Sequence, residues 1–146
     1  MIIGFTGTRL KMNSLQRRIL IDLLGSDPRF ENDEDADEIY EFHHGDCVGA
    51  DRQAFQVARD LGWTTVSHPG IGGMRAGTPS DIILTSKPLL ERDKDIAEVC
   101  EYLMATPHTE VEIQRSGTWT TVRYARSLGK PILIILPWGQ VKEERL

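Results

Sequence analysis

Short apolar segments of strand length recur along the chain and are bounded by glycine or polar residues. They predict five strands, at residues 2–5, 40–44, 63–67, 99–105 and 132–136. The last of these segments contains no polar residue, which is typical of a parallel strand that is buried on both faces.

Four helices are expected in the gaps between these strands. Their capping or first-turn residues are Ser14, Asp51, Pro88 and Thr118. The first helix is expected to bury Leu15, Ile19 and Leu23, which follow one another at helical spacing. Because strands and helices alternate, we expect one α/β domain over residues 1–146. Its predicted fold is a Rossmann-like, open parallel sheet of about five strands with helices on both faces.

Two segments interrupt this alternation. Residues 26–38 form an acidic loop, and residues 68–87 form a long loop that is rich in glycine and proline. Long loops in compact domains often act as lids over functional sites, so we expect the second loop to be lid-like. The charges of the first loop are Glu31, Asp33, Glu34, Asp35, Asp37 and Glu38. The net charge of the chain is −5, so the rest is nearly neutral, and a solvated loop is favoured over a cation site.

The remaining composition narrows the class of protein. No apolar run approaches the length of about 20 residues that a membrane span needs, and the first residues do not resemble a secretory signal. No basic stripe is evident, so nucleic acid is an unlikely partner. The four histidines show no metal-ligand spacing, and no metal site is expected. Cys47 and Cys100 are interpreted as free thiols of a cytoplasmic protein.

Ligands of open parallel sheets bind outside the carboxyl ends of the strands, so the loops that follow the strands carry the candidate chemistry. The loop after the first strand contains Thr6, Gly7, Thr8 and Arg9. Glycine permits close backbone approach, the two hydroxyls can hydrogen-bond, and the guanidinium can hold a phosphate or carboxylate. The alternative is a simple strand-to-helix turn with an exposed arginine.

The loop after the second strand leads directly into a predicted helix and is flanked by Gly45 and Gly49. Helix N-termini attract anions, so this loop is a second candidate binding element. Asp46 could accept hydrogen bonds from a ribose hydroxyl. Asp51 is favoured as a helix cap over a catalytic group, and Cys47 as a small buried thiol over a nucleophile.

The third candidate loop places Ser116, Gly117 and Thr118 at the start of the last predicted helix, followed one turn later by Thr121. Free amide groups, hydroxyls and the helix dipole together would make a phosphate cradle, although a simple serine cap explains the same residues.

Charged residues also open the preceding helix. Arg92 could reach a phosphate, and Glu91 or Asp93 could serve as a catalytic acid or base. A solvated helix face is the alternative.

Taken together, these segments resemble the SLOG superfamily of Rossmann-like proteins. That superfamily includes the "lonely guy" phosphoribohydrolases, lysine-decarboxylase-like proteins and the core of DNA-processing protein A, and the resemblance is closest to small bacterial and phage members. It implies a nucleotide-type ligand across the three loops and frequently a homodimer. The matching segments appear in family order at residues 4–9, 44–51, 68–69, 90–96 and 116–125.

One departure from the phosphoribohydrolase motif bears on activity. Ser116 replaces a glycine, and Thr121 stands where the motif has its catalytic glutamate; no carboxylate lies between residues 116 and 136. The favoured hypothesis is therefore a module that binds or senses a nucleotide or an ADP-ribose-like phosphate ligand. The alternative is an N-glycosidic hydrolase or transferase acting on a nucleoside monophosphate, and handling of single-stranded DNA is less favoured.

Overall fold

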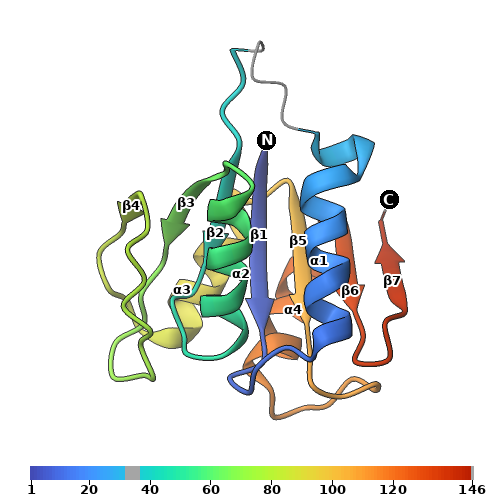
Figure 1. Cartoon of the computed structure of the whole chain (residues 1–146). Helices are drawn as coiled ribbons and strands as arrows, with labels where there is room; N and C mark the ends of the chain where they lie inside the picture. The colour runs from blue at the N-terminus through green and yellow to red at the C-terminus, as the bar shows by residue number, and fades with distance from the viewer. Residues whose placement is uncertain (32–36, 146) are drawn as a thin grey trace.

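The computed structural model of the chain describes residues 1–31 and 37–145, and its centre is a seven-stranded sheet in the order β4-β3-β2-β1-β5-β6-β7 (Figure 1). All neighbouring strands are parallel except β6 and β7, which are antiparallel. The strands are β1 (Ile2–Gly7), β2 (Glu41–His44), β3 (Thr64–Ser67), β4 (Ile82–Ile83), β5 (Tyr102–Thr106), β6 (Ile132–Ile135) and β7 (Val141–Glu144).

The predicted fold class is confirmed, but the sheet has two more strands than expected. Both additions lie at the edges. β4 is a two-residue strand within the 68–87 loop, and β7 follows a turn after β6. Neither has the apolar pattern of a buried strand: β7 has the sequence Val-Lys-Glu-Glu, and β4 is too short to show a periodicity.

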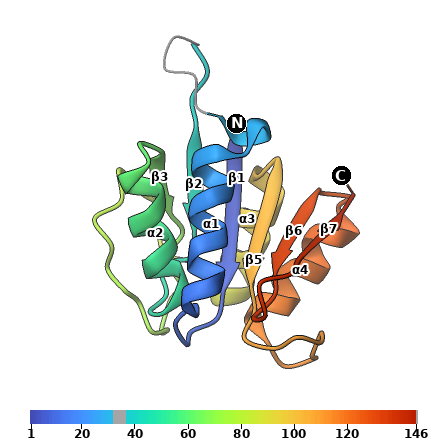
Figure 2. The ribbon, with the colours of Figure 1, turned by 45° about the vertical axis from the view of Figure 1, so that its right-hand side comes forward.

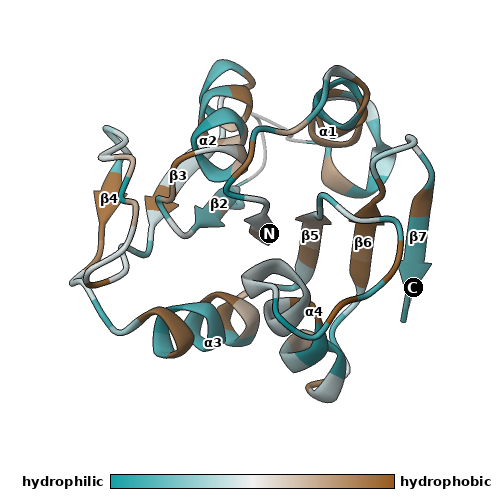
Figure 3. Ribbon diagram, turned by 90° about the horizontal axis from the view of Figure 1, so that it is seen from below, coloured by the Kyte–Doolittle hydropathy of each residue, from teal (hydrophilic) through white to brown (hydrophobic). Residues whose placement is uncertain are grey.

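The helices cover the two faces of the sheet in pairs. α1 and α2 lie on one face and α3 and α4 on the other, as the views along and across the sheet show (Figures 2 and 3). All strands except β7 end at the edge that faces the viewer in Figure 3, so the loops that follow them gather there. The helices are α1 (Ser14–Ser26), the short 3-10 helix η1 (Pro28–Phe30), α2 (Ala50–Asp60), α3 (Leu89–Val99) and α4 (Gly117–Ser127).

Each face of the sheet has its own apolar core. Strand β6 shows why a central parallel strand is apolar throughout: Leu133 and Ile135 belong to the core under α1 and α2, and Ile132 and Ile134 to the core under α3 and α4. All four are fully buried. The unbroken apolar run in the sequence therefore indicates a strand covered on both sides.

The expected buried face of the first helix is confirmed only in part: Ile19 and Leu23 are half-buried and pack against the core, but the fully buried row lies one position further along. The residues that α1 buries are Gln16, Leu20 and Leu24, whereas Leu15 is 44% exposed. A polar residue occupies the buried row because the Gln16 amide donates hydrogen bonds to the carbonyls of Pro107 and Ile135, at 2.8 and 3.0 Å. The apolar spacing of the helix does not reveal this glutamine as a buried residue.

The cap of the same helix also differs from the prediction. Asn13, rather than Ser14, is the N-cap: its side chain accepts a hydrogen bond from the Gln16 amide, and the Gln16 side chain accepts one from the Asn13 amide. This reciprocal pair is a capping box, which ties the buried glutamine to the helix start.

Two glycines let the first two candidate loops touch. The amide of Ala50 donates to the carbonyl of Thr8 at 2.9 Å. Gly49 has φ +90°, and a side chain there would overlap the Arg9 carbonyl. A side chain at Gly7 would come within 2.5 Å of the Ala50 methyl group. Larger residues at either position would push the loops apart, so both glycines have a structural reason to be present.

The acidic loop falls partly outside the described residues, since 32–36 are not among them. At the end of this loop, Asp37 and Glu38 are described and exposed. Glu38 accepts a hydrogen bond from the terminal ammonium group of Met1 at 2.9 Å.

Candidate ligand-binding site

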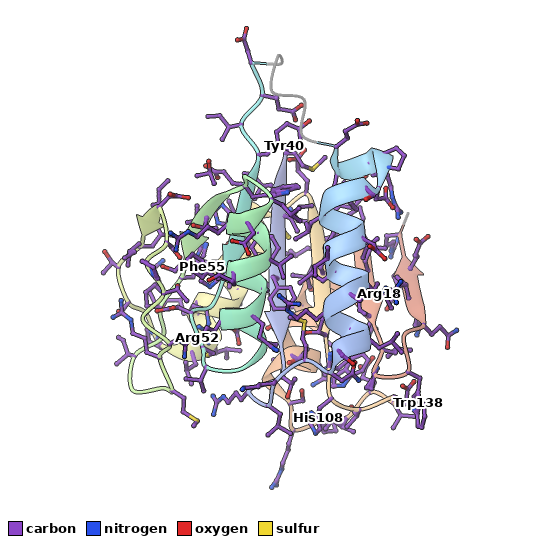
Figure 4. The ribbon with its side chains drawn as sticks, in the orientation of Figure 1. Arg18, Tyr40, Arg52, Phe55, His108 and Trp138 are labelled. Carbon is purple, nitrogen blue, oxygen red and sulfur yellow. The ribbon has the colours of Figure 1, made fainter. Side chains whose placement is uncertain are left out.

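A cavity of about 540 Å³ lies at the carboxyl ends of the strands, and all three candidate loops contribute to its wall. The start of α3 closes another side, and Leu10, Leu89 and Leu90 add apolar surface. His108, whose side chain lies at this end of the molecule in Figure 4, also lines it. Of the residues predicted for the site, ten line the cavity: Thr6, Gly7, Thr8, Arg9, Gly45, Arg92, Asp93, Ser116, Gly117 and Thr118.

The N-terminus of α4 forms one end of this cavity. Ser116 is its N-cap and accepts a hydrogen bond from the amide of Trp119 at 3.2 Å. Gly117 and Thr118 follow, and the first N–H groups of a helix have no acceptor within the helix. These N–H groups and the helix dipole favour an anion.

Two arginines on the cavity wall are available to such an anion. Arg9 and Arg115 are both exposed and both line the cavity. Among the described residues, neither guanidinium has a partner in a salt bridge or a side-chain hydrogen bond. Arg115 belongs to the third loop but was not singled out as a ligand residue, because its position before the helix cap carries no motif.

Arg92 is a different kind of arginine, since it is buried and already bonded to the protein. Its Nε donates to Asp93 Oδ1 at 2.7 Å, and its Nη1 donates to the carbonyls of Gly45 and His68. Because these carbonyls follow β2 and β3, the side chain joins α3 to both strand ends. The expected reach of Arg92 toward a phosphate is therefore secondary to a role in holding the cavity wall together.

Asp46 does not line the cavity and has a structural role in place of the predicted contact with ribose. Its carboxylate accepts hydrogen bonds from the amide and hydroxyl of Thr78, at 2.9 and 2.7 Å, and from Nε of Arg75 at 3.1 Å and the amide of Gly77 at 3.3 Å. These bonds fix the 68–87 loop against the second candidate loop. None of the described residues from 68 to 87 is in the wall of the large cavity.

Three other predicted residues also lie outside the cavity wall. Gly49 serves the loop contact described above. The Thr121 hydroxyl donates to the carbonyl of Gly117 at 2.9 Å and is buried. The Glu91 side chain is 57% exposed and its nearest cation is Lys87, at 4.0 Å.

Asp51 is the functional candidate that the sequence pattern underrated. Gly49, not Asp51, is the N-cap of α2, and Asp51 lies in the first turn. It lines the cavity and is only 5% exposed. Its Oδ2 accepts a hydrogen bond from the amide of Cys47 at 3.1 Å, whereas its Oδ1 has no partner among the described residues. A cap and a buried cavity carboxylate look the same in sequence, because both stand at the start of a helix.

Burial changes the proton affinity of three groups in this wall. It raises the pKa of Asp51 to about 7, although the Cys47 amide and the charge of Arg92 oppose the shift. It also raises the pKa of Asp93, against the opposing charge of Arg92. The pKa of the Cys47 thiol is raised by burial and by the charge of Asp51, so this thiol stays protonated at neutral pH and is a poor nucleophile.

Among the described residues, no helix is long and apolar enough to cross a membrane, and no group of three or more His, Cys, Asp or Glu side chains is placed to hold a metal ion. Cys47 and Cys100 are both free.

Solved structures with a similar fold support the Rossmann-like architecture. The protein TM1055 has a TM-score of 0.65 and 19% identity, over 90% of this chain and 71% of its own. The molybdenum cofactor binding protein of Rippkaea orientalis has a TM-score of 0.63 and 18% identity, over 92% of this chain and 76% of its own. The molybdenum cofactor carrier protein of Chlamydomonas reinhardtii has a TM-score of 0.61 and 19% identity, over 91% of this chain and 75% of its own.

At these identities the likeness concerns the fold. The sequence itself matches no model of a known protein family and no curated protein.

Replacing Asp51 with Asn should stabilise the protein at high pH relative to the parent chain. The carboxyl has a pKa of about 7 in the folded protein and about 3.8 in the unfolded chain. Between these values the folded state binds the proton more tightly, so the parent chain loses stability as pH rises through this window. The gain of Asp51→Asn over the parent should therefore grow by up to about 4 kcal/mol between about pH 4 and pH 8.

Urea unfolding at the two pH values measures this difference. Asp22→Asn, which changes an exposed carboxylate on α1, is the matched control and should leave the pH dependence unaltered. If Asp51→Asn and the parent chain have parallel stability curves, the carboxyl of Asp51 is not held protonated by burial.

Proposed function

We propose that the cavity binds a small phosphate-bearing ligand of nucleotide type, such as a nucleotide or ADP-ribose, with a phosphate at the N-terminus of α4. The observation that carries this proposal is a pair of guanidinium groups, those of Arg9 and Arg115, on the wall of the cavity that contains this helix end; within residues 1–31 and 37–145 neither has a salt bridge or a side-chain hydrogen bond. Fixed N–H groups and two available cations together favour an anion with several acceptor oxygens.

The rest of the cavity suits the organic part of such a ligand. Its volume of about 540 Å³ is within the usual range for small-molecule sites. The apolar side chains of Leu10, Leu89 and Leu90 offer a surface against which a flat base could pack. Thr6 and Thr8 add hydroxyl-bearing side chains to the wall of the site.

The resemblance to the SLOG superfamily agrees with this proposal, and the Rossmann-like fold of the similar structures is compatible with it. Two of those structures are named for the molybdenum cofactor. That cofactor is therefore a ligand to test beside AMP and ADP-ribose.

An N-glycosidic hydrolase is a second candidate function, and one observation favours it. Asp93 lies in the cavity wall, and burial raises the pKa of its carboxyl. A general acid for glycosidic cleavage must hold its proton near neutral pH. Glu91, the other carboxylate of this segment, is outside the cavity wall, so of the two only Asp93 supports this candidate.

Replacing Arg9 or Arg115 with Ala should weaken binding of AMP or ADP-ribose roughly ten- to a hundredfold for each charge-assisted contact removed, because such contacts contribute roughly 1.5–3 kcal/mol. Isothermal titration calorimetry measures this change. Arg18→Ala, which removes an exposed arginine on the outside of α1 (Figure 4), is the matched control and should bind like the parent chain.

Equal affinities for all four proteins would contradict the placement of the phosphate. Salt-dependent binding of a single-stranded oligonucleotide, with no binding of mononucleotides, would favour the nucleic-acid hypothesis.

Prolonged incubation of the protein with AMP or ADP-ribose separates binding from turnover. The binding module leaves the ligand intact, whereas the hydrolase releases free base or ribose, which chromatography detects. If turnover occurs, Asp93→Asn should abolish it and Glu91→Gln should retain it, because of these two carboxylates only Asp93 lies in the cavity wall. Full activity of Asp93→Asn would exclude this assignment of the acid.

A further inference from the structure

One almost completely buried residue of the large cavity's wall has a side-chain oxygen without a hydrogen-bond partner in the part of the chain that the structure describes. Three buried side-chain atoms lack a partner among the described residues: Asp51 Oδ1, Ser67 Oγ and Thr106 Oγ1. Of these residues only Asp51 belongs to the cavity wall. A buried polar atom without a partner is costly, and each such atom in a folded protein calls for an explanation.

Contacts within the loop give Asp51 Oδ2 a hydrogen-bond partner but give Oδ1 none. The Cys47 amide holds Oδ2 at 3.1 Å, which fixes the side chain across the turn before α2. Helix capping does not account for Oδ1, because the N-cap is Gly49 and α2 has no side-chain cap bond. The helix dipole stabilises the charge of an acidic residue in the first turn but does not donate a hydrogen bond to it.

The charged groups around Asp51 do not supply the missing bond. Arg92, the nearest cation, donates to Asp93, Gly45 and His68, and its Nη2 lies 3.7 Å from Cys47 Sγ. The neighbouring carboxylates, Asp46 and Asp93, act on Asp51 only by repulsion. A donor for Oδ1 must therefore come from outside the described protein.

We propose that Asp51 is a ligand-contacting residue, whose Oδ1 accepts a hydrogen bond from a sugar hydroxyl of the phosphate-bearing ligand. This assignment rests on the proposed function. The α4 end takes the anion, and α2 and α4 cover opposite faces of the sheet (Figure 3), so the ligand extends past the end of β1 to reach Asp51. Above the pKa of Asp51, which is about 7, its charge would repel a second anionic group, whereas a hydroxyl is a donor without charge.

A sugar phosphate or a nucleotide is the chemical class that has an anion for the start of α4 and a hydroxyl for Asp51. The sequence predicted that Asp46 accepts a hydrogen bond from a ribose hydroxyl. We assign this contact to Asp51 because the carboxylate of Asp46 is already bonded to the 75–78 segment.

The test compares ribose 5-phosphate with inorganic phosphate on the parent chain and on Asp51→Asn, by NMR titration. Asn can keep the bond from the Cys47 amide through its oxygen, and it then presents an NH₂ donor to the cavity where the parent presents an acceptor. Asp51→Asn should bind ribose 5-phosphate about tenfold more weakly and inorganic phosphate with unchanged affinity, because only ribose 5-phosphate has a sugar hydroxyl that can extend from the α4 end to Asp51.

The controls separate this inference from the proposed function. Arg115→Ala should weaken both probes, and Asp22→Asn should weaken neither. A cooperative urea unfolding curve is required of Asp51→Asn, so that loss of the fold is not mistaken for loss of the contact. If Asp51→Asn binds ribose 5-phosphate as the parent does while Arg115→Ala loses both probes, Asp51 is not the sugar contact and the anion site stands. If the parent chain binds neither probe at millimolar concentration, the proposed function fails and this assignment fails with it.

Discussion

The site depends on a backbone contact between two loops that are far apart in sequence. The amide of Ala50 donates to the carbonyl of Thr8, and Gly7 and Gly49 allow the approach because neither has a side chain to hold the loops apart. This contact joins the end of β1 to the start of α2. The cavity wall is then continuous from the first loop to the second, and Asp51 is carried into it by the first turn of α2.

Arg92 extends the same wall to the other face of the sheet. Its bonds to the carbonyls of Gly45 and His68 hold α3 against the ends of β2 and β3. The buried guanidinium thus works as a structural clamp, while Arg9 and Arg115 remain available to a ligand. The wall of the cavity therefore combines two kinds of groups. The arginines and the helix amides favour an anion, and Asp51, whose Oδ1 has no partner in the described part of the chain, favours a hydrogen-bond donor.

The architecture and the three loops could be predicted from the sequence because they rest on periodicity and on the rule that ligands bind at the carboxyl ends of parallel strands. The edge strands could not, because β7 is polar and β4 is only two residues long. Single side chains within the loops were harder still. Asp46 and Asp51 lie in one glycine-flanked loop, and only the folded chain shows that Asp46 is bonded to the 75–78 segment while Asp51 faces the cavity. Gln16 was missed for a similar reason, since its acceptors are carbonyls of distant segments.

Titration of ¹⁵N-labelled protein with AMP, followed by amide chemical shifts, tests most directly that the three loops form one ligand site. The amides of Gly7, Gly45 and Gly117 should shift together along one saturation curve, because these residues line a single cavity. Shifts confined to one loop, shifts that saturate at different concentrations, or no shifts in these loops at millimolar AMP would contradict the claim.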